Sequence, residues 1–166
     1  MAPAASFGQV SLGPEFRVNT YTTGNQYIPD VASDSAGNFV VVWINYGRDG
    51  SVGGIFGQRY AASGAPLGTE FRVNSYTTND QRFPSVASDS AGNFVVVWES
   101  TLQDGAEEGI FGQRYAASGV PVGPEFRVNS YTTNAQDRPV VTRDASGAFV
   151  VVWVSHEQDG AMRGIF

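Results

Sequence analysis

The sequence predicts an all-β fold built from three copies of one unit. Glu-Phe-Arg-Val-Asn begins at residues 15, 70 and 125, and Phe-Val-Val-Val-Trp begins at residues 39, 94 and 149, so both motifs recur every 55 residues. Apolar residues alternate or run in short stretches between turn residues, and no stretch has the period of an amphipathic helix. We divide this single repeat domain into an N-terminal arm, 1–14, and repeats 15–69, 70–124 and 125–166. Such regularity is typical of recent duplication or of design.

Each unit is expected to contain four short strands, which in the first copy are residues 29–33, 39–43, 55–60 and 70–74. The first two flank Asp-Ser-Ala-Gly-Asn, residues 34–38, where Asp and Gly favour a tight hairpin. The second strand is apolar on both pleat faces, so it must be covered from both sides. The third and fourth strands mix apolar and polar residues and are expected further out.

A central strand covered on both faces is what one blade of a β-propeller requires, because each blade packs between two others. We therefore predict a β-propeller of four-stranded antiparallel blades, with three blades in this chain. The tryptophan that ends each valine run, at 43, 98 and 153, is expected to pack between blades and not to form an aromatic binding shelf.

The hairpin segment Val31–Val40, repeated at Val86–Val95, resembles the inner hairpin of NHL-type and sialidase-like propeller blades. The wider pattern of Phe-Arg-Val-Asn, Gln-Asp-Gly and Gly-Ile-Phe-Gly-Gln-Arg-Tyr is similar to repeats of large bacterial surface and secreted, adhesin-like proteins. This resemblance implies a propeller at an extracellular or cell-surface location. It brings no catalytic residues, and the Asp box of sialidases is not matched.

Composition narrows the classes of partner. The net charge is −6 and the ten basic residues are all arginine, so nucleic acid is not expected as a partner. The chain has no cysteine, which excludes disulfides and cysteine-bound metals. No apolar run approaches the length of a membrane span.

Catalytic motifs are not apparent. His156 is the only histidine, and neither Gly-x-Ser-x-Gly nor a phosphate-binding glycine loop occurs. Arg82 and Arg138 fall one position apart in their units, so on regular strands they face opposite ways. We therefore predict no enzyme and no cofactor, but a non-enzymatic propeller module that acts as a structural, self-assembling scaffold with a ligand-binding loop face. The alternatives are a carbohydrate-binding (lectin-like) or adhesin module and, third, a glycosidase or sialidase-like enzyme.

Differences between the copies gather in the loops at one end of the strands. These loops carry a mixture of side chains suited to a glycan or a peptide. Drift in unconstrained surface loops explains the same variation. The candidate ligand-binding residues are Tyr27, Tyr46, Arg48, Arg82, Phe83, Glu107, Glu108, Arg138, His156 and Arg163.

An Asp-Gly pair recurs in all three units, at Asp49, Asp104 and Asp159. A carboxylate at each position could bind calcium. Asp-Gly also suits a hairpin turn without any metal.

Assembly is expected because three blades cannot close a ring and an open arc exposes an apolar blade face. The chain is therefore predicted to pair with itself, as a homodimer of six blades or a homotrimer of nine. Residues 12–19 are expected to supply an N-terminal strand that completes the last blade of another subunit. Residues 6–9 resemble 55–58 and compete with 165–166 for one place in that blade.

Overall fold

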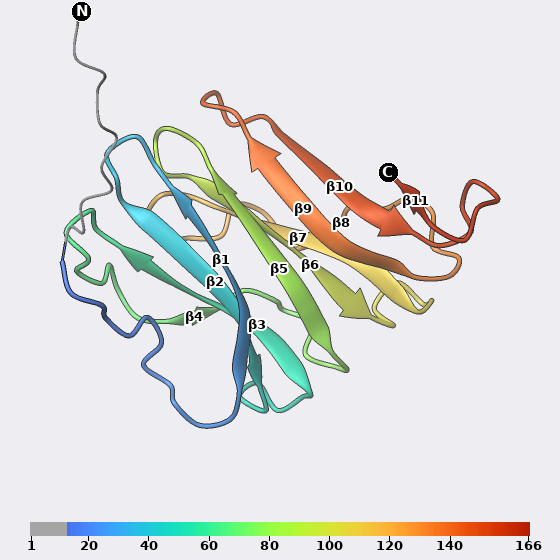
Figure 1. Ribbon diagram of the computed structural model, residues 1–166, viewed down its shortest axis with the longest axis horizontal. Helices are drawn as coiled ribbons and strands as arrows, with labels where there is room; N and C mark the ends of the chain where they lie inside the picture. Colours follow the sequence, from blue (N-terminus) through green and yellow to red (C-terminus); the bar gives the residue numbers. More distant parts are fainter. Residues whose placement is uncertain (1–12) are drawn as a thin grey trace, which may run out of the picture.

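Eleven strands in three antiparallel sheets make up the described part of the chain, residues 13–166 of a computed structural model (Figure 1). The predicted all-β class is confirmed. No helix long and apolar enough to span a membrane occurs in this part of the chain. Sheet 1 contains β1 (Gln26–Ser33), β2 (Phe39–Tyr46), β3 (Gly53–Tyr60) and β4 (Phe71–Arg72); sheet 2 contains β5 (Gln81–Ser88), β6 (Phe94–Thr101), β7 (Glu108–Tyr115) and β8 (Phe126–Arg127); sheet 3 contains β9 (Gln136–Arg143), β10 (Phe149–Ser155) and β11 (Gly164–Ile165).

The sheets stand face to face, with sheet 2 between the other two (Figure 1). In each sheet the strands are paired in chain order, so that β1, β5 and β9 form one edge of their sheets. These three strands also contact one another, β1 with β5 and β5 with β9. We call them the inner strands.

The second strand of the unit carries the core in sheets 1 and 2, whereas Val150 and Val152 of β10 in sheet 3 are exposed. Val40 and Val42 on one face of β2 belong to the cluster shared with sheet 2, whereas Val41 and Trp43 on the other face belong to a second cluster. The alternation of a β-strand places neighbouring residues on opposite faces, and both faces are buried. Trp98 on β6 is fully buried, as expected for packing between blades.

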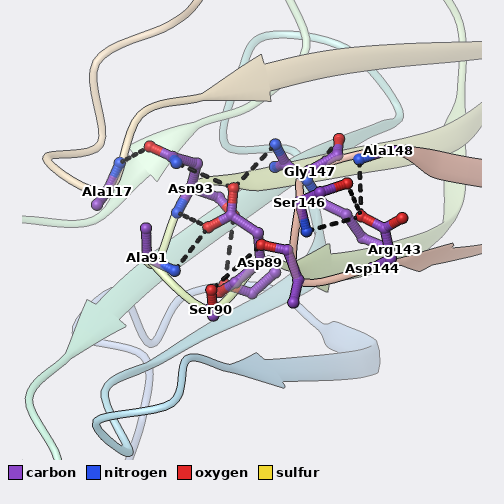
Figure 2. A network of polar contacts seen from close by, with 12 residues as sticks. Asp89, Ser90, Ala91, Asn93, Ala117, Arg143, Asp144, Ser146, Gly147 and Ala148 are labelled. Carbon is purple, nitrogen blue, oxygen red and sulfur yellow. Dashed lines mark hydrogen bonds and ion pairs between the residues drawn. The ribbon is translucent and has the colours of Figure 1, made fainter.

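The hairpins that follow the inner strands share one construction. Asp89 Oδ1 accepts the backbone N–H groups of Ala91 and Asn93, at 3.0 and 2.9 Å, and its Oδ2 accepts the Asn93 side-chain amide (Figure 2). Arg143 of the next unit completes this network with an ion pair of 3.1 Å to Asp89. The predicted tight turn is therefore present and is tied to its neighbour.

The fourth strand is shorter than the expected 70–74. Val73 N–H still donates to the Ile55 carbonyl, at 2.8 Å, but the Ile55 N–H donates to the Asn74 side chain and not to a backbone carbonyl. A side chain thus takes the place of the next ladder bond, and β4 ends at Arg72.

The expected N-terminal strand over 12–19 is not found among residues 13–25, which contain no strand. Instead, Val18 packs on sheet 1 and accepts a hydrogen bond of 2.6 Å from the Tyr60 hydroxyl. The Tyr115 hydroxyl donates to the Val73 carbonyl in the same way. The residues around Val18 therefore lie against sheet 1 as the residues around Val73 lie against sheet 2. The expectation for residues 6–9 lies outside the described residues.

Candidate functional site

Each inner strand has a β-bulge at the same position of its repeat. The bulged residues Ile28, Phe83 and Arg138 have φ values of 50°, 49° and 53°. Side chains of this size rarely adopt a positive φ, and such strain gathers at binding and catalytic sites. A proline follows each bulged residue, which suits a position where the ladder is interrupted.

The three bulges line one open groove of about 400 Å³, formed by residues 28–30, 83–85 and 138–140. Two polar side chains at its base connect the inner strands. Asp30 Oδ2 accepts the Val86 N–H at 2.8 Å, and Ser85 Oγ accepts the Val141 N–H at 3.3 Å. The groove is therefore built on strands that are fastened to each other.

A charged cluster adjoins this groove at the interface of sheets 2 and 3. Arg82 on β5 contacts Glu99 on β6 and Glu108 on β7 through the same nitrogen, Nη2, at 2.9 and 3.1 Å. Its Nε lies 3.4 Å from Asp80. The Glu99 side chain is only 2% exposed, whereas about a third of Arg82 is exposed, so the arginine separates Glu99 from solvent.

Backbone and side-chain contacts connect the cluster to the groove. Glu99 Oε2 accepts the N–H of Arg138, the bulged residue of β9, at 3.4 Å. The Arg138 guanidinium lies 5.3 Å from the centre of the Phe83 ring. The neighbouring Asp137 is paired with His156 at 3.0 Å. Groove and cluster therefore form one candidate site.

The environment of Glu99 favours its protonated form. Burial raises the pKa of Glu99 from 4.5 to about 7, and the negative charges of Glu108 and Asp137 act in the same direction. Arg82 and the N–H of Arg138 lower the pKa, but burial outweighs them. The pKa of Asp80 is also raised by burial, against the effect of Arg82. Glu99 can therefore hold a proton near neutral pH.

Glu99 and Glu108 hold two carboxyl groups against one arginine nitrogen. Because both accept from Arg82 Nη2, these two carboxylate oxygens lie no farther apart than about 6 Å. Two carboxyl groups in different surroundings can divide the roles of proton donor and nucleophile. A buried carboxyl group with a raised pKa beside a second carboxyl group is the kind of pair that acid-assisted displacement requires.

The structure brings half of the predicted site residues together. Five of the ten lie in or beside the groove and the cluster: Arg82, Phe83, Glu108, Arg138 and His156. Tyr27 and Tyr46 form a separate aromatic pair on sheet 1, with ring centres 5.7 Å apart. Glu107 and Arg163 are exposed.

Arg48 is held within sheet 1. It forms an ion pair with Glu70, and its guanidinium lies 4.7 Å from the Tyr21 ring centre and 4.4 Å from that of Phe56. The pKa of Glu70 is lowered, because hydrogen bonds from Thr20 and Arg48 outweigh the effect of burial. These contacts fix the loop after β2.

Sequence reasoning missed Asp30, Asp80, Glu99 and Asp137. A signal for Glu99 was present, since the same position of the other two units is occupied by Ile44 and Val154. A carboxyl group buried at one of three equivalent core positions needs ionic or hydrogen-bonding partners. A buried carboxyl group with such partners is a candidate for a functional site.

The three Asp-Gly positions form turns. Asp49, Asp104 and Asp159 each accept a backbone N–H from two residues further on, at 3.1, 3.3 and 3.1 Å. Asn129 also donates to Asp104, at 3.2 Å. Within residues 13–166 no group of three or more acidic or histidine side chains is arranged to bind a metal ion. Calcium at these positions stays a prediction.

Comparison of the sequence with models of protein families and with curated proteins finds no match. Solved structures are similar in fold. An endo-1,4-β-xylanase from Bacteroides thetaiotaomicron matches with a TM-score of 0.51 and 9% identity, over 92% of this chain and 56% of that one. A Penicillium chrysogenum α-L-arabinanase in complex with arabinobiose matches with a TM-score of 0.50 and 15% identity, over 85% and 42%.

A Hadza microbial sialidase also matches, with a TM-score of 0.50 and 10% identity, over 84% of this chain and 37% of that one. The chain thus spans roughly half or less of the length of these proteins. Sialidase- and arabinanase-type structures are β-propellers, so the resemblance to sialidase-like propellers is confirmed at the level of the fold. The NHL-type and adhesin-like resemblances stay predictions.

The prediction of a non-enzymatic scaffold, and hence of no enzyme, is wrong, because these neighbours are glycosidases and the fold is glycosidase-like. The error has a physical cause. Arg82 and Arg138 were expected to face opposite ways on regular strands, but Arg138 is itself the bulged residue of β9, where the regular alternation is interrupted. The Arg82 side chain and the backbone N–H of Arg138 both contact Glu99. Local motifs cannot reveal a site assembled from strands of three sheets.

Proposed function

We propose that this chain belongs to a propeller-type glycoside hydrolase, in which the groove binds a glycan and Glu99 is the proton donor. The observation that carries the proposal is the buried Glu99, with its pKa of about 7, held beside Glu108 and against the groove. The names of the structural neighbours point to arabinan, xylan or sialylated glycans as the substrate class.

The proposed reaction uses the two carboxyl groups in sequence. Glu99 protonates the glycosidic oxygen as the bond to the anomeric carbon breaks, and the Glu108 carboxylate bonds to that carbon. Glu99, now ionised, accepts a proton from the water that releases the sugar and regenerates both groups. Arg82 contacts both carboxyl groups as well as Asp80, and it orients the pair.

We propose a closed propeller ring as the complete architecture. The three sheets are three propeller blades, and two or three copies of the chain close a ring of six or nine blades. Polymeric or surface-linked glycans are substrates outside cells, which supports an extracellular location. We propose hydrolysis of such glycans as the activity of the whole protein.

The test is hydrolysis of soluble arabinan, xylan and sialyllactose by the purified chain, followed by release of reducing ends or of sialic acid. We expect one of the three to be cleaved, and Glu99→Gln to lower kcat at least about 100-fold, because the amide cannot donate an acidic proton. Glu107→Gln is the matched control, since Glu107 is exposed on the loop before β7 and is expected to leave kcat unchanged.

The pH profile gives an independent readout. Because Glu99 must be protonated, kcat/KM is expected to fall as the pH rises above about 7. Far-ultraviolet circular dichroism of Glu99→Gln checks that the variant is folded. Absence of cleavage of all three glycans, or full activity in folded Glu99→Gln, would overturn the proposal.

A further inference from the structure

Sheet 3 has an open apolar face. The side chains of Val150, Val152 and Ile165 are 62%, 42% and 74% exposed. They stand 55 residues after Val95, Val97 and Ile110, which are completely buried. We call the surface of Val150, Val152 and Ile165 the open face.

The repeat identifies what covers such a face. In sheet 2, the row with Val95 and Val97 packs against Val141 and Val151 of sheet 3. In sheet 1, the equivalent row, Val40, Val42 and Ile55, packs against Val86, Val96 and Trp98 of sheet 2. Two successive interfaces therefore use the same pair of surfaces, 55 residues apart.

Sheet 1 presents the complementary surface. Val31 is 60% exposed, although its equivalent Val86 is only 5% exposed beneath sheet 1. Beside it, a hollow of about 150 Å³ is lined by Val41, Trp43 and Pro29, among others. At the equivalent place on sheet 2, Val96 and Trp98 are fully buried. Val41 and Trp43 are only 9% and 4% exposed, so they line the hollow but contribute little surface themselves. We call the exposed Val31 and the hollow beside it the receiving face.

We propose that the open face of one chain docks onto the receiving face of a second copy of this chain. The occupant is a second copy because its sheet 1 carries the surface that matches the open face at both internal interfaces, with a hollow where those interfaces are filled. The contact is head-to-tail, so each copy uses a different face and the assembly closes into a ring or extends.

This docking would also extend the groove. At both internal interfaces the inner strands of adjoining sheets lie in contact, β1 with β5 and β5 with β9. The same geometry places β1 of the second copy, with its bulge at Ile28 and the Asp30 carboxylate, beside Val140 of β9. Only this consequence rests on the proposed hydrolase function; the docking itself does not.

The experiment measures mass in solution, by light scattering after size exclusion and by native mass spectrometry, across a wide range of concentrations. We expect the unaltered chain to associate. Val152→Glu on the open face and Val31→Glu on the receiving face should each weaken association at least about 100-fold, because each would bury an unpaired charge. Val122→Glu is the control, since Val122 is exposed but lies on neither face.

Mixing the two variants tests the direction of docking. Val152→Glu retains an intact receiving face and Val31→Glu retains an intact open face, so an equimolar mixture should form a heterodimer although each variant alone is monomeric. Association of Val31→Glu by itself would indicate that two open faces pack together and would overturn the proposal. A monomeric unaltered chain at every concentration would overturn it as well.

Discussion

Glu99 is a carboxyl group at a position where the other two repeats have aliphatic side chains. Ile44 and Val154 occupy the equivalent positions, and the Ile44 side chain is fully buried in the core. Burying a carboxyl group there disfavours its ionised form, and Arg82 compensates only in part. Residues that lower stability in this way are often kept for function.

We therefore predict that Glu99→Ile stabilises the fold above neutral pH. The native state keeps the Glu99 proton up to a pH of about 7, whereas the unfolded state releases it near 4.5. The native state thus binds more protons between these values, so the free energy of unfolding falls as the pH rises, by about 3 kcal/mol in total. The isoleucine cannot titrate, so this fall should disappear.

Chemical denaturation at a series of pH values measures this effect. Glu107→Ile is the control, because Glu107 is exposed and should leave the slope between pH 4.5 and 7 unchanged. If Glu99→Ile retained the slope of the unaltered protein, Glu99 would not be the titrating group. The same variant is expected to be inactive towards glycans, since it has no proton to donate.

At the scale of elements, the hairpins after the inner strands show how neighbouring units are fastened. Asp34 and Asp89 bind their own turns in the same manner, but only Asp89 also pairs with an arginine, Arg143 of the next sheet. Burial alone would raise the pKa of Asp89, yet hydrogen bonds from Asn93 and Ala91 and the charge of Arg143 lower it. The contribution of Asp89 is therefore present at neutral pH and lost in acid.

Asp89→Asn is predicted to destabilise the protein by about 2–3 kcal/mol, since an amide at Oδ2 would face the donors of Asn93 and Arg143. Asp34→Asn, which disturbs a turn without an arginine, should cost less. Thermal unfolding of both variants at pH 7 compares them. Equal losses would mean that the Arg143 ion pair contributes nothing.

Equivalent valines in β6 and β10 provide a second comparison between elements. Val97 is completely buried between sheets 2 and 3, whereas Val152 lies on the open face. Val97→Ala should destabilise the chain by about 2 kcal/mol, because two methyl groups leave a packed core. Val152→Ala should leave the stability of the monomer within about 0.5 kcal/mol.

Urea denaturation at a concentration that keeps the chain monomeric measures both values. A loss at Val152 as large as at Val97 would show that the open face is already covered within one chain. Repetition at high concentration should then reveal a cost for Val152→Ala through weaker association.

For the molecule as a whole, the sequence was sufficient to predict the sheets because their signals are local. Valine runs, Asp-Ser-Ala-Gly-Asn turns and the 55-residue period depend on neighbouring residues, and the strands lie where these patterns indicate. The end of β4 was missed because the Asn74 side chain replaces a backbone partner, which a strand pattern does not reveal.

The site could be predicted only in part, because its residues meet across sheets. Arg82 and Arg138 were identified as candidates in the loops at one end of the strands, but the contact between the Arg138 N–H and Glu99 crosses between two sheets at a bulge. Proline at 29, 84 and 139 marks these bulges in the sequence. The sequence shows that Glu99 is a carboxyl group at a position that is apolar in the other repeats, but it does not show which side chains surround Glu99.

If the proposed docking extends the groove, assembly and activity must be coupled, and this is the last prediction. Activity per chain towards the cleaved glycan should rise with protein concentration as the inner strand β1 of a second copy joins the groove. Val152→Glu should lower this activity under conditions where the unaltered chain is associated, although Val152 lies away from the Glu99 cluster. Mixing Val152→Glu with Val31→Glu should restore part of the loss, because one intact interface forms. Activity independent of concentration, with association confirmed by mass, would show that one chain contains the complete site.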